Sequence, residues 1–266
     1  MNINSTKLVY FSPTQTTKKV IEAIAETIES TRVEHVDLTP PAALTRKPME
    51  VHDELALIGS PVYAGRLPVD MIARLRRLKG NNTPAAIVVV YGNRAYEDAL
   101  RELRDLALEI GFRPVAGGAF IAEHSYSTAA VPVAAGRPDG DDLMRAREFG
   151  KTINEKMSSL TTDGGTLPLQ VPGNFPYKER AGLVNVAPVT DHTVCTRCEK
   201  CIPVCPTAAI TLQDTVTTDP GMCIRCCACI KICPEGARSM EDPRIKQVVE
   251  NLNRNCRARK EPEIYF

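Results

Sequence analysis

The hydrophobic and polar positions of the first 160 residues alternate between short apolar runs and amphipathic stretches. The apolar runs predict five β-strands, at Lys7–Phe11, Arg32–Asp37, Glu54–Gly59, Ala85–Tyr91 and Arg113–Ile121. Two of these runs, "LALIG" and "AAIVVVYG", are almost continuously apolar, as expected of central parallel strands buried on both faces. Helical patterns separate the strands, so residues 1–160 are expected to form a doubly wound α/β domain with a five-stranded parallel sheet.

The first helical pattern covers Thr17–Ser30. Its apolar residues recur at a spacing of three or four, which places Val20, Ile21, Ile24 and Ile28 on one face. This spacing predicts an amphipathic helix that covers the sheet.

Three strand ends carry loops that are unlike routine connections. These are "FSPTQTT" after the first strand, "GSPVYAGRLP" after the third and "YGNRAYED" after the fourth. Ligands of doubly wound sheets bind at the carboxyl ends of the strands. We therefore expect a ligand site where these three loops meet.

The composition changes near residue 160. Residues 161–184 are rich in proline and glycine and are interpreted as a linker. Residues 185–241 hold nine of the ten cysteines and form a second, small domain, and residues 242–266 form a C-terminal helix and tail.

Composition and charge exclude several classes of function. The apolar content is 43%, as in ordinary folded proteins, and the formal net charge is +1, which gives no general attraction to nucleic acid or anionic membranes. No apolar run is long enough for a membrane helix and the N-terminus lacks signal-peptide features, so a cytoplasmic protein without a membrane or nucleic-acid partner is expected. Ten cysteines in that compartment favour metal or redox chemistry over disulfides.

The cysteines follow one motif that occurs twice. "CTRCEKCIPVCP" and "CIRCCACIKICP" both read C-x2-C-x2-C-x3-C-P, and each cysteine of the second copy lies 28 positions after its counterpart. The alternative is a pair of structural zinc sites, but zinc sites usually join two separated CxxC pairs. The crowded spacing favours two [4Fe-4S] clusters, whose ligands are Cys195, Cys198, Cys201, Cys205, Cys223, Cys226, Cys229 and Cys233.

Residues 185–240 resemble the bacterial two-cluster ferredoxins, which have a small α+β fold. The resemblance implies that the fourth cysteine of each motif crosses over, so that Cys233 joins Cys195, Cys198 and Cys201, and Cys205 joins Cys223, Cys226 and Cys229. Cys227 and Cys256 are left over. We expect Cys227 to point away from the cluster and Cys256 to be a partly exposed free thiol.

The α/β domain lacks two familiar nucleotide signatures. Neither G-x-G-x-x-G after a strand nor G-x-x-x-x-G-K-[ST] occurs, which argues against nicotinamide and triphosphate sites. The first loop instead resembles the flavodoxin phosphate loop, S/T-x-T-G-x-T. The resemblance implies a flavodoxin-like fold and binding of the phosphate of flavin mononucleotide (FMN) by Ser12, Thr14, Gln15, Thr16 and Thr17, with Gln15 in place of the glycine.

The other two loops extend this resemblance. "GSPVYAGRLP" is similar to the segment of flavodoxins that lies against the flavin ring, which implies ring contacts from Pro61, Val62, Tyr63, Ala64 and Gly65. "YGNRAYEDAL" is similar to the G-D-Q-x-x-Y pattern, which implies contacts from Tyr91, Gly92, Asn93 and Arg94 and stacking by Tyr96.

The catalytic residue is left unknown. His124, in the long loop Phe120–Leu143, is a weak candidate for an acid or base, although a lone loop histidine is more often structural. Arg66 and Arg94 are candidates for balancing the charge of a reduced flavin.

As a whole, the chain resembles a family of flavodoxin–ferredoxin fusion proteins common in anaerobes. The resemblance implies an oxidoreductase in which FMN and two [4Fe-4S] clusters exchange single electrons with a redox protein or a small-molecule acceptor. The alternative is a non-enzymatic carrier whose α/β domain docks a partner without FMN; Pro13 and Gln15 favour it. The sequence leaves the oligomeric state open.

Overall fold

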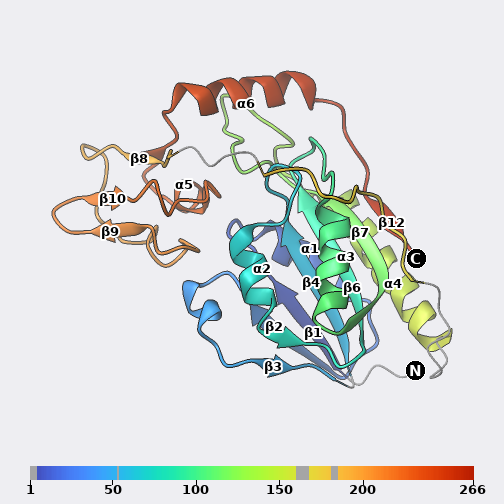
Figure 1. Ribbon diagram of the computed structural model, residues 1–266. Coiled ribbons are helices and arrows are strands. Elements are labelled where there is room, and N and C mark those ends of the chain that lie inside the picture. Colours follow the sequence, from blue (N-terminus) through green and yellow to red (C-terminus); the bar gives the residue numbers. More distant parts are fainter. Residues whose placement is uncertain (1–4, 53, 160–167, 181–184) are drawn as a thin grey trace.

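A computed structural model describes residues 5–52, 54–159, 168–180 and 185–266 (Figure 1). Five parallel strands form the centre of the α/β part, in the order β2–β1–β4–β6–β7. They are β1 (Ser5–Tyr10), β2 (Arg32–Asp37), β4 (Leu55–Pro61), β6 (Thr83–Tyr91) and β7 (Phe112–Ile121). Numbered among themselves, they run 2-1-3-4-5, which is the flavodoxin-like strand order. The predicted fold and its five strands are confirmed.

A sixth strand was not predicted. The chain end returns to the sheet and β12 (Glu263–Tyr265) pairs antiparallel with β7, opposite Gly117–Ala119. Among the described residues the sheet therefore has six strands and not the predicted five. The added strand covers the edge of β7, which would otherwise be unpaired.

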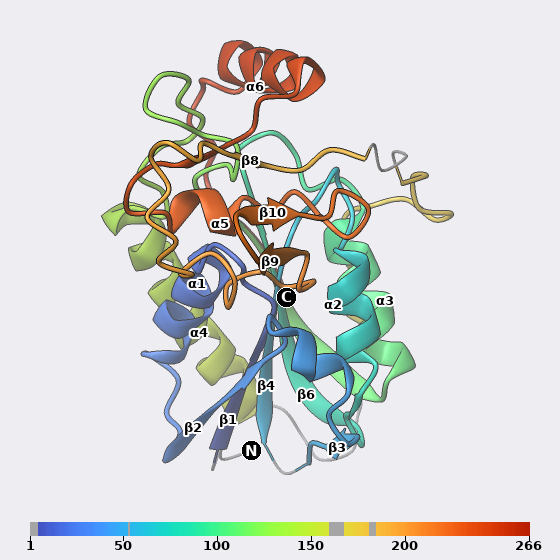
Figure 2. The same ribbon diagram turned by 90° about the vertical axis from the view of Figure 1, so that its left-hand side faces the viewer.

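Helices cover both faces of the sheet. α1 (Thr16–Ala25) and α4 (Gly140–Ser159) pack together on one face, and α2 (Val69–Leu75) and α3 (Ala99–Glu109) cover the other (Figure 2). The predicted apolar face of α1 is confirmed, since Val20, Ile21, Ile24 and Ile28 are buried. The helix itself ends at Ala25, earlier than predicted, and turns follow.

The remaining elements of the α/β part are small. A 3-10 turn, η1, spans Pro41–Leu44, and β3 (Met49–Glu50) pairs in parallel with β5 (Leu78–Lys79). No helix in the described part of the chain is long and apolar enough to cross a lipid bilayer.

The cysteine-rich part is built from two short hairpin-like pairs. β9 (Ile210–Leu212) pairs with β10 (Val216–Thr218), β8 (Val189–Thr190) pairs with β11 (Arg238–Ser239), and the short helix α5 spans Ala228–Lys231. This part lies across the end of the α/β sheet (Figure 2).

Two segments tie the parts together. Residues 168–180, part of the predicted linker, run along α3, where Asp98 accepts hydrogen bonds from the backbone N–H groups of Asn174 and Lys178, both at 2.7 Å. Residues 161–167 and 181–184 of that linker lie outside the described residues. The predicted C-terminal helix is α6 (Pro243–Asn255), capped by Asp242, and the tail follows it back to the sheet.

Candidate functional site

The loop after β1 carries several unpaired hydrogen-bond donors at the start of α1. No backbone hydrogen bond joins the N–H groups of Thr14, Thr16 or Thr17 to another described residue. The hydroxyl of Thr17 is buried and also lacks a hydrogen-bond partner. Unpaired donors at a helix N-terminus attract an anion, so this loop fits the phosphate of a flavin mononucleotide.

Gln15 adopts a left-handed backbone conformation, which favours glycine. Its φ is 64° and ψ is −2°. The residue is held there because its backbone N–H and its side-chain Nε2 both donate to the Ser12 carbonyl, at 3.1 and 3.0 Å. A non-glycine residue in this region costs about 1–2 kcal/mol. The glutamine side chain thus helps to hold the backbone conformation that a glycine would adopt more easily.

Ser12 and Thr39 fix the base of this loop. The Ser12 backbone N–H donates to Thr39 Oγ1 at 2.8 Å, and the Ser12 hydroxyl accepts from the Lys18 backbone N–H at 3.1 Å. Ser12 therefore supports the loop, whereas Thr17 and the free N–H groups are the donors that remain for a phosphate.

The loop after β4 makes a tight turn. Tyr63 and Arg66 exchange backbone hydrogen bonds at 2.9 and 3.1 Å across Ala64 and Gly65, which both have positive φ. A side chain at Gly65 would overlap Glu97, so glycine is required. Pro61 ends β4, Val62 packs against the core, and Tyr63 is half-buried at the head of the turn.

The loop after β6 is placed differently from the prediction. Tyr91 and Tyr96 are both buried in the core, with ring centroids 5.4 Å apart. The Tyr96 hydroxyl is bonded to Glu263 and Tyr265 of the tail, at 2.7 and 2.8 Å. The structure thus shows what the Tyr96 hydroxyl binds within the chain, while stacking of the ring on a flavin stays a prediction.

Asn93 and the two arginines of these loops are also engaged. The Asn93 amide donates to the carbonyls of Cys256 and Ala258 in the tail, at 2.7 and 2.9 Å. Arg66 forms a two-pronged ion pair with Glu102, and Arg94 pairs with Glu97 at 2.6 Å. Both arginines have carboxylate partners already, which argues against the suggested role in balancing a reduced flavin.

His124 packs against the backbone of its own loop and of the loop after β6. Its Nδ1 accepts a hydrogen bond from the Tyr126 N–H at 3.1 Å, and its ring lies so close to Gly92 that a side chain there would clash. Burial, with smaller effects of Arg94 and Lys231, lowers the pKa of His124 to about 4. The imidazole is therefore neutral near pH 7, and its contacts explain a structural role.

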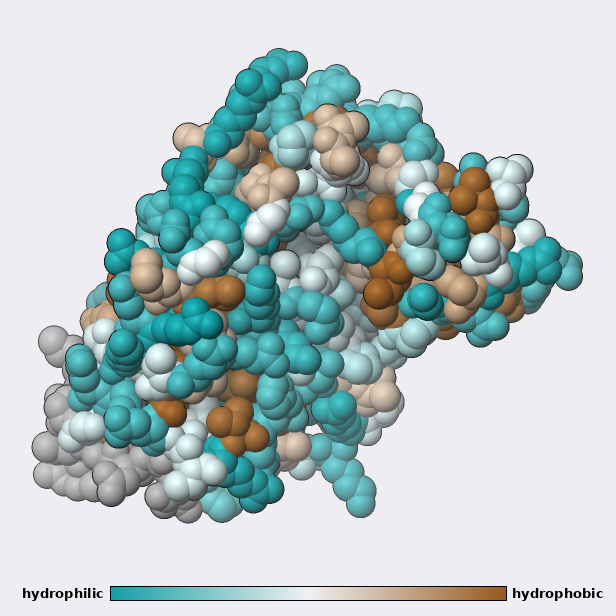
Figure 3. All heavy atoms as spheres, turned by 180° about the vertical axis from the view of Figure 1, so that it is seen from behind, coloured by the Kyte–Doolittle hydropathy of each residue, from teal (hydrophilic) through white to brown (hydrophobic). Residues whose placement is uncertain are grey.

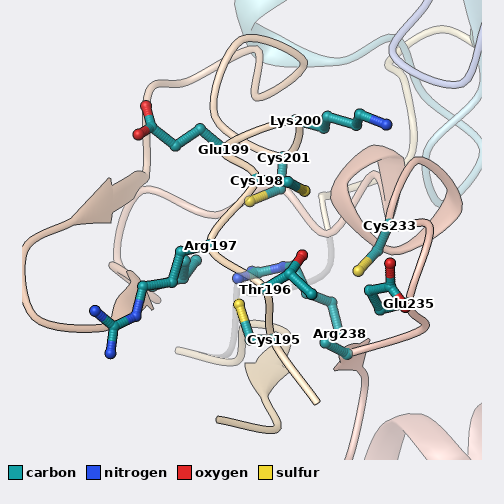
Figure 4. A pocket seen from close by; sticks show the side chains of 12 residues that line it. Cys195, Thr196, Arg197, Cys198, Glu199, Lys200, Cys201, Cys233, Glu235 and Arg238 are labelled. Atoms are coloured by element: carbon teal, nitrogen blue, oxygen red, sulfur yellow. The ribbon is translucent and has the colours of Figure 1, made fainter. Parts of the chain in front are cut away.

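The eight motif cysteines form two sets, each around its own space. Set 1 comprises Cys195, Cys198, Cys201 and Cys233, whose side chains line one pocket (Figure 4). Set 2 comprises Cys205, Cys223, Cys226 and Cys229, which line a second pocket. The fourth cysteine of each motif thus lies with the other motif, as the ferredoxin resemblance implied.

The arrangement of the thiols fits a multi-iron cluster. Among the described residues, no group of three or more His, Cys, Asp or Glu side chains converges on a point that could hold a single metal ion. The thiols of each set instead surround a space, which suits a cluster that binds each cysteine to a different iron. Soft thiolate donors are the ligands expected for such a group.

The two leftover cysteines differ in their surroundings. Cys227 is buried, with φ 59°, and its thiol lies 3.6 Å from the carbonyl of Arg225. Burial, together with the neighbouring cysteines, raises the pKa of Cys227 well above its usual value. It also borders the set 2 pocket. Cys256 is partly exposed at the end of α6, as predicted.

Set 2 is packed against the α/β part. Burial is the main cause that raises the pKa of Tyr63. The next causes are the nearby groups Cys226, Cys227 and Tyr126. Ile224, between two set 2 cysteines, packs against the core of the α/β part. The predicted ring loop and the second cysteine motif are therefore neighbours.

Two cationic side chains hold this junction. Arg74 of α2 is buried and donates to the carbonyls of Leu38 and Thr39, at 2.9 and 2.7 Å, and to that of Pro206 at 2.6 Å. Lys231 of α5 donates to Glu123 at 2.5 Å and to the Ser127 carbonyl at 2.7 Å.

Sequence reasoning missed the contacts of Arg74 and Lys231 at this junction and the return of the tail to the sheet. Arg74 gave no signal, because an arginine on a helix is ordinarily solvated. Lys231 gave one, since its counterpart 28 positions earlier is Pro203 and a difference between repeats marks a difference in surroundings.

Comparison with known proteins divides the chain in the same way. Residues 187–234 match the family model described as a 4Fe-4S dicluster domain. A search of curated protein sequences found no match.

Several solved structures are similar to the α/β part. A flavodoxin from the domain Archaea is 16% identical, covering 58% of this chain and 99% of that one, with a TM-score of 0.38. The Fusobacterium nucleatum flavodoxin bound to flavin mononucleotide is 12% identical, covering 57% and 98%, with a TM-score of 0.39. Rubredoxin oxygen:oxidoreductase from Desulfovibrio gigas is 13% identical, covering 59% and 36%, with a TM-score of 0.38.

Likenesses at this level do not establish a ligand or a reaction, and the fold assignment comes from the strand order itself. With the dicluster match, that order shows that the chain joins a flavodoxin-like domain to an iron-sulfur domain of the ferredoxin type.

Proposed function

We propose that this protein is an electron-transfer oxidoreductase that passes single electrons between FMN in the α/β part and two [4Fe-4S] clusters in the cysteine-rich part. One observation carries the proposal: the second cysteine motif packs against the α/β part through Ile224, and Cys226 and Cys227 are near enough to Tyr63 of the 61–65 turn to raise its pKa. The two cofactor sites would then share one boundary, and electrons would cross it without leaving the protein.

The chain's own residues define how each group would be held. The Thr17 hydroxyl and the N–H groups of Thr14, Thr16 and Thr17 would bind the phosphate, and the 61–65 turn would lie beside the ring. Set 1 and set 2 would each hold one cluster through four thiolates. A flavin exchanges electrons singly or in pairs, whereas a cluster carries them one at a time.

The difference in exposure supports an order for the relay. The two sets differ at one pair of equivalent ligands, since Cys198 of set 1 is exposed and Cys226 of set 2 is buried, whereas Cys201 and Cys229 are both buried. Set 1 would therefore exchange electrons with a redox protein or a small acceptor, and set 2 would connect set 1 to the flavin. Val189 and Val194, near Cys195, are exposed apolar side chains that would suit a docking surface. Viewed from behind, hydrophobic side chains also reach the surface of the cysteine-rich part (Figure 3).

The experiment is an FMN titration of anaerobically reconstituted protein, with Thr17→Val as the test variant. The Thr17 hydroxyl has no partner in the protein, so its removal should leave the FMN-free protein as stable as before. It should weaken FMN binding roughly tenfold or more, since a hydrogen bond to a charged group contributes about 1.5–3 kcal/mol.

Thr6→Val is the matched control. Thr6 lies near the start of β1, at the end of the strand away from the loop, and its hydroxyl is likewise buried without a partner. Its loss should not change the affinity for FMN. Equal FMN affinity in Thr17→Val and wild type would contradict the phosphate site.

A second candidate is an electron carrier whose α/β part binds a partner and not FMN. The engagement of Asn93 and Tyr96 by the tail favours it, because two residues of a predicted flavin loop are already bonded within the chain. Wild-type protein that holds a full complement of iron but binds no FMN would establish this candidate and reject the first.

A further inference from the structure

Arg238 is a buried cation in the middle of the cysteine-rich part. Its exposed fraction is 3%, and it is the only charged residue that is buried among the described residues from 185 to 241. It lies on β11 and lines the set 1 pocket (Figure 4). A buried charge is costly unless an opposite charge compensates it, so its surroundings are informative.

No carboxylate compensates this guanidinium within the described residues. Its two terminal nitrogens donate to the hydroxyls of Thr190 and Thr218, at 2.9 and 2.5 Å, and its Nε is buried without a partner. Hydroxyls satisfy the geometry of the donors but supply no negative charge. The charge must therefore be balanced by something else.

The internal duplication singles out this position. Thr190 and Thr218 are 28 residues apart, and so are Ile210 and Arg238. Ile210 pairs with Thr218 across β9 and β10, just as Arg238 pairs with Thr190 across β11 and β8. An apolar side chain thus fills the equivalent place in the first repeat, which shows that this fold does not need a charge there.

Arg238 lies beside the thiols of set 1. Its side chain lines the same pocket as the four cysteines of that set. The group that those thiolates would bind is therefore next to a buried cation.

We propose that Arg238 is a fixed positive charge that balances the iron-sulfur cluster of set 1 and makes it easier to reduce. The inference rests on the proposed pair of clusters but not on FMN. Reduction adds one electron from an external donor to a cluster and breaks no ligand bond, so the added negative charge is stabilised by a nearby cation. Arg238 would thereby set the potential at which the relay accepts electrons.

The test is a redox titration of the full chain, followed by electron paramagnetic resonance, with dithionite as reductant and dyes as mediators. Arg238→Ile copies the residue of the first repeat, Arg238→Gln removes only the charge, and Arg238→Lys keeps it. Both neutral variants should shift the midpoint of the set 1 cluster to a more negative value. At a fixed potential the ratio of reduced to oxidised cluster should fall roughly tenfold, which is about 59 mV for one electron.

Arg197→Gln is the control, because Arg197 lines the same set 1 pocket but is exposed to solvent. Its loss should shift the set 1 midpoint less, since water screens an exposed charge. A set 1 midpoint that stays unchanged in both neutral variants would overturn the proposal, as would an equal shift in Arg238→Lys.

Cluster assembly gives a further measurement should the neutral variants lose their clusters. Loss of iron from both neutral variants, with full iron in Arg238→Lys, would support a need for the charge. Loss from all three would overturn the proposal in favour of a packing role. Wild-type protein without iron would instead reject the proposed clusters, so the two failures are distinguishable.

Discussion

Cys198 and Cys226 occupy the same place in two repeats 28 residues apart, yet Cys198 is exposed and Cys226 is buried. The loop around set 1 faces solvent over most of its length, whereas the loop around set 2 is covered by the α/β part. The same ligand pattern is therefore placed in two environments, which suits one cluster for exchange with a partner and the other for contact within the protein.

The differences between the repeats follow this division. Thr196, Glu199 and Lys200 of the first repeat correspond to Ile224, Cys227 and Ala228 of the second. The polar residues are exposed, while Cys227 and Ala228 are buried and Ile224 packs against the α/β core. Cys227 is thus explained as one of the small or apolar residues that the junction requires, without a role as a ligand.

The largest test of this division removes Arg74, which bonds to the carbonyl of Pro206 next to Cys205 of set 2. Arg74→Ala should lower the free energy of unfolding by about 3 kcal/mol or more, because three buried carbonyls lose a charged donor at once. Denaturation in urea measures the loss. The set 2 cysteines should also become accessible to alkylation in the metal-free protein, because Pro206 adjoins Cys205.

Arg76→Ala is the control on the same side of the molecule. Arg76 follows α2 and pairs with Glu109 at 3.0 Å, but both side chains are more than half exposed. The loss should be well under 1 kcal/mol, since water screens such pairs. Equal destabilisation by the two variants would contradict the anchoring role of Arg74.

The second test compares the stability of the two proposed clusters toward a chelator. Iron should leave wild-type protein in two phases of equal size, with the exposed set 1 cluster released roughly tenfold faster. Cys198→Ser should remove the fast phase and keep the slow one, and Cys226→Ser should do the reverse. A single phase in wild type would show that the two environments do not differ in access.

Periodicity and spacing predicted the five parallel strands, the covering helices and the eight motif cysteines, because each of these follows from local pattern. The crossed membership of the two cysteine sets came from the resemblance to two-cluster ferredoxins. The left-handed backbone conformation of Gln15 could not be predicted. It depends on two hydrogen bonds to the Ser12 carbonyl, and no glycine in the loop marks it. The sixth strand was missed because Glu263–Tyr265 is short and pairs only through a contact with β7 far away in the sequence.

The loop after β6 shows the limit of motif reasoning. Its pattern predicts a stacking tyrosine, which stays a prediction, but it gave no sign that the tail bonds the Tyr96 hydroxyl and the Asn93 amide. A contact between residues more than 160 positions apart leaves no trace in a local motif. The differences between the two cysteine repeats are more informative. The second repeat has apolar residues where the first has polar ones, which predicts that the second repeat is the buried one.

The smallest test concerns Lys231, which replaces Pro203 of the first repeat and pairs with Glu123 at the junction. Burial raises the pKa of Glu123, but the hydrogen bonds from Lys231 and from the Gly136 N–H outweigh it, so that the pKa is lowered overall. Lys231→Met should therefore reduce stability at pH 7 by about 1 kcal/mol, a modest value because both side chains are about one-third exposed.

The pH dependence of that loss gives its sign. A carboxylate whose pKa is lowered by folding stabilises the protein above its unfolded pKa of about 4.3, and the contribution disappears as the pH falls through the lower folded value. The difference between wild type and Lys231→Met should thus be full at pH 7 and shrink below about pH 4. Lys246→Met, which breaks an exposed pair with Glu241 on α6, should change nothing measurable. The loss for Lys231→Met could instead be the same at pH 3 and pH 7. That result would mean that the lysine acts through its bond to the Ser127 carbonyl and not through Glu123. Of the charged contacts at the junction, only those of Arg74 would then remain beside apolar packing.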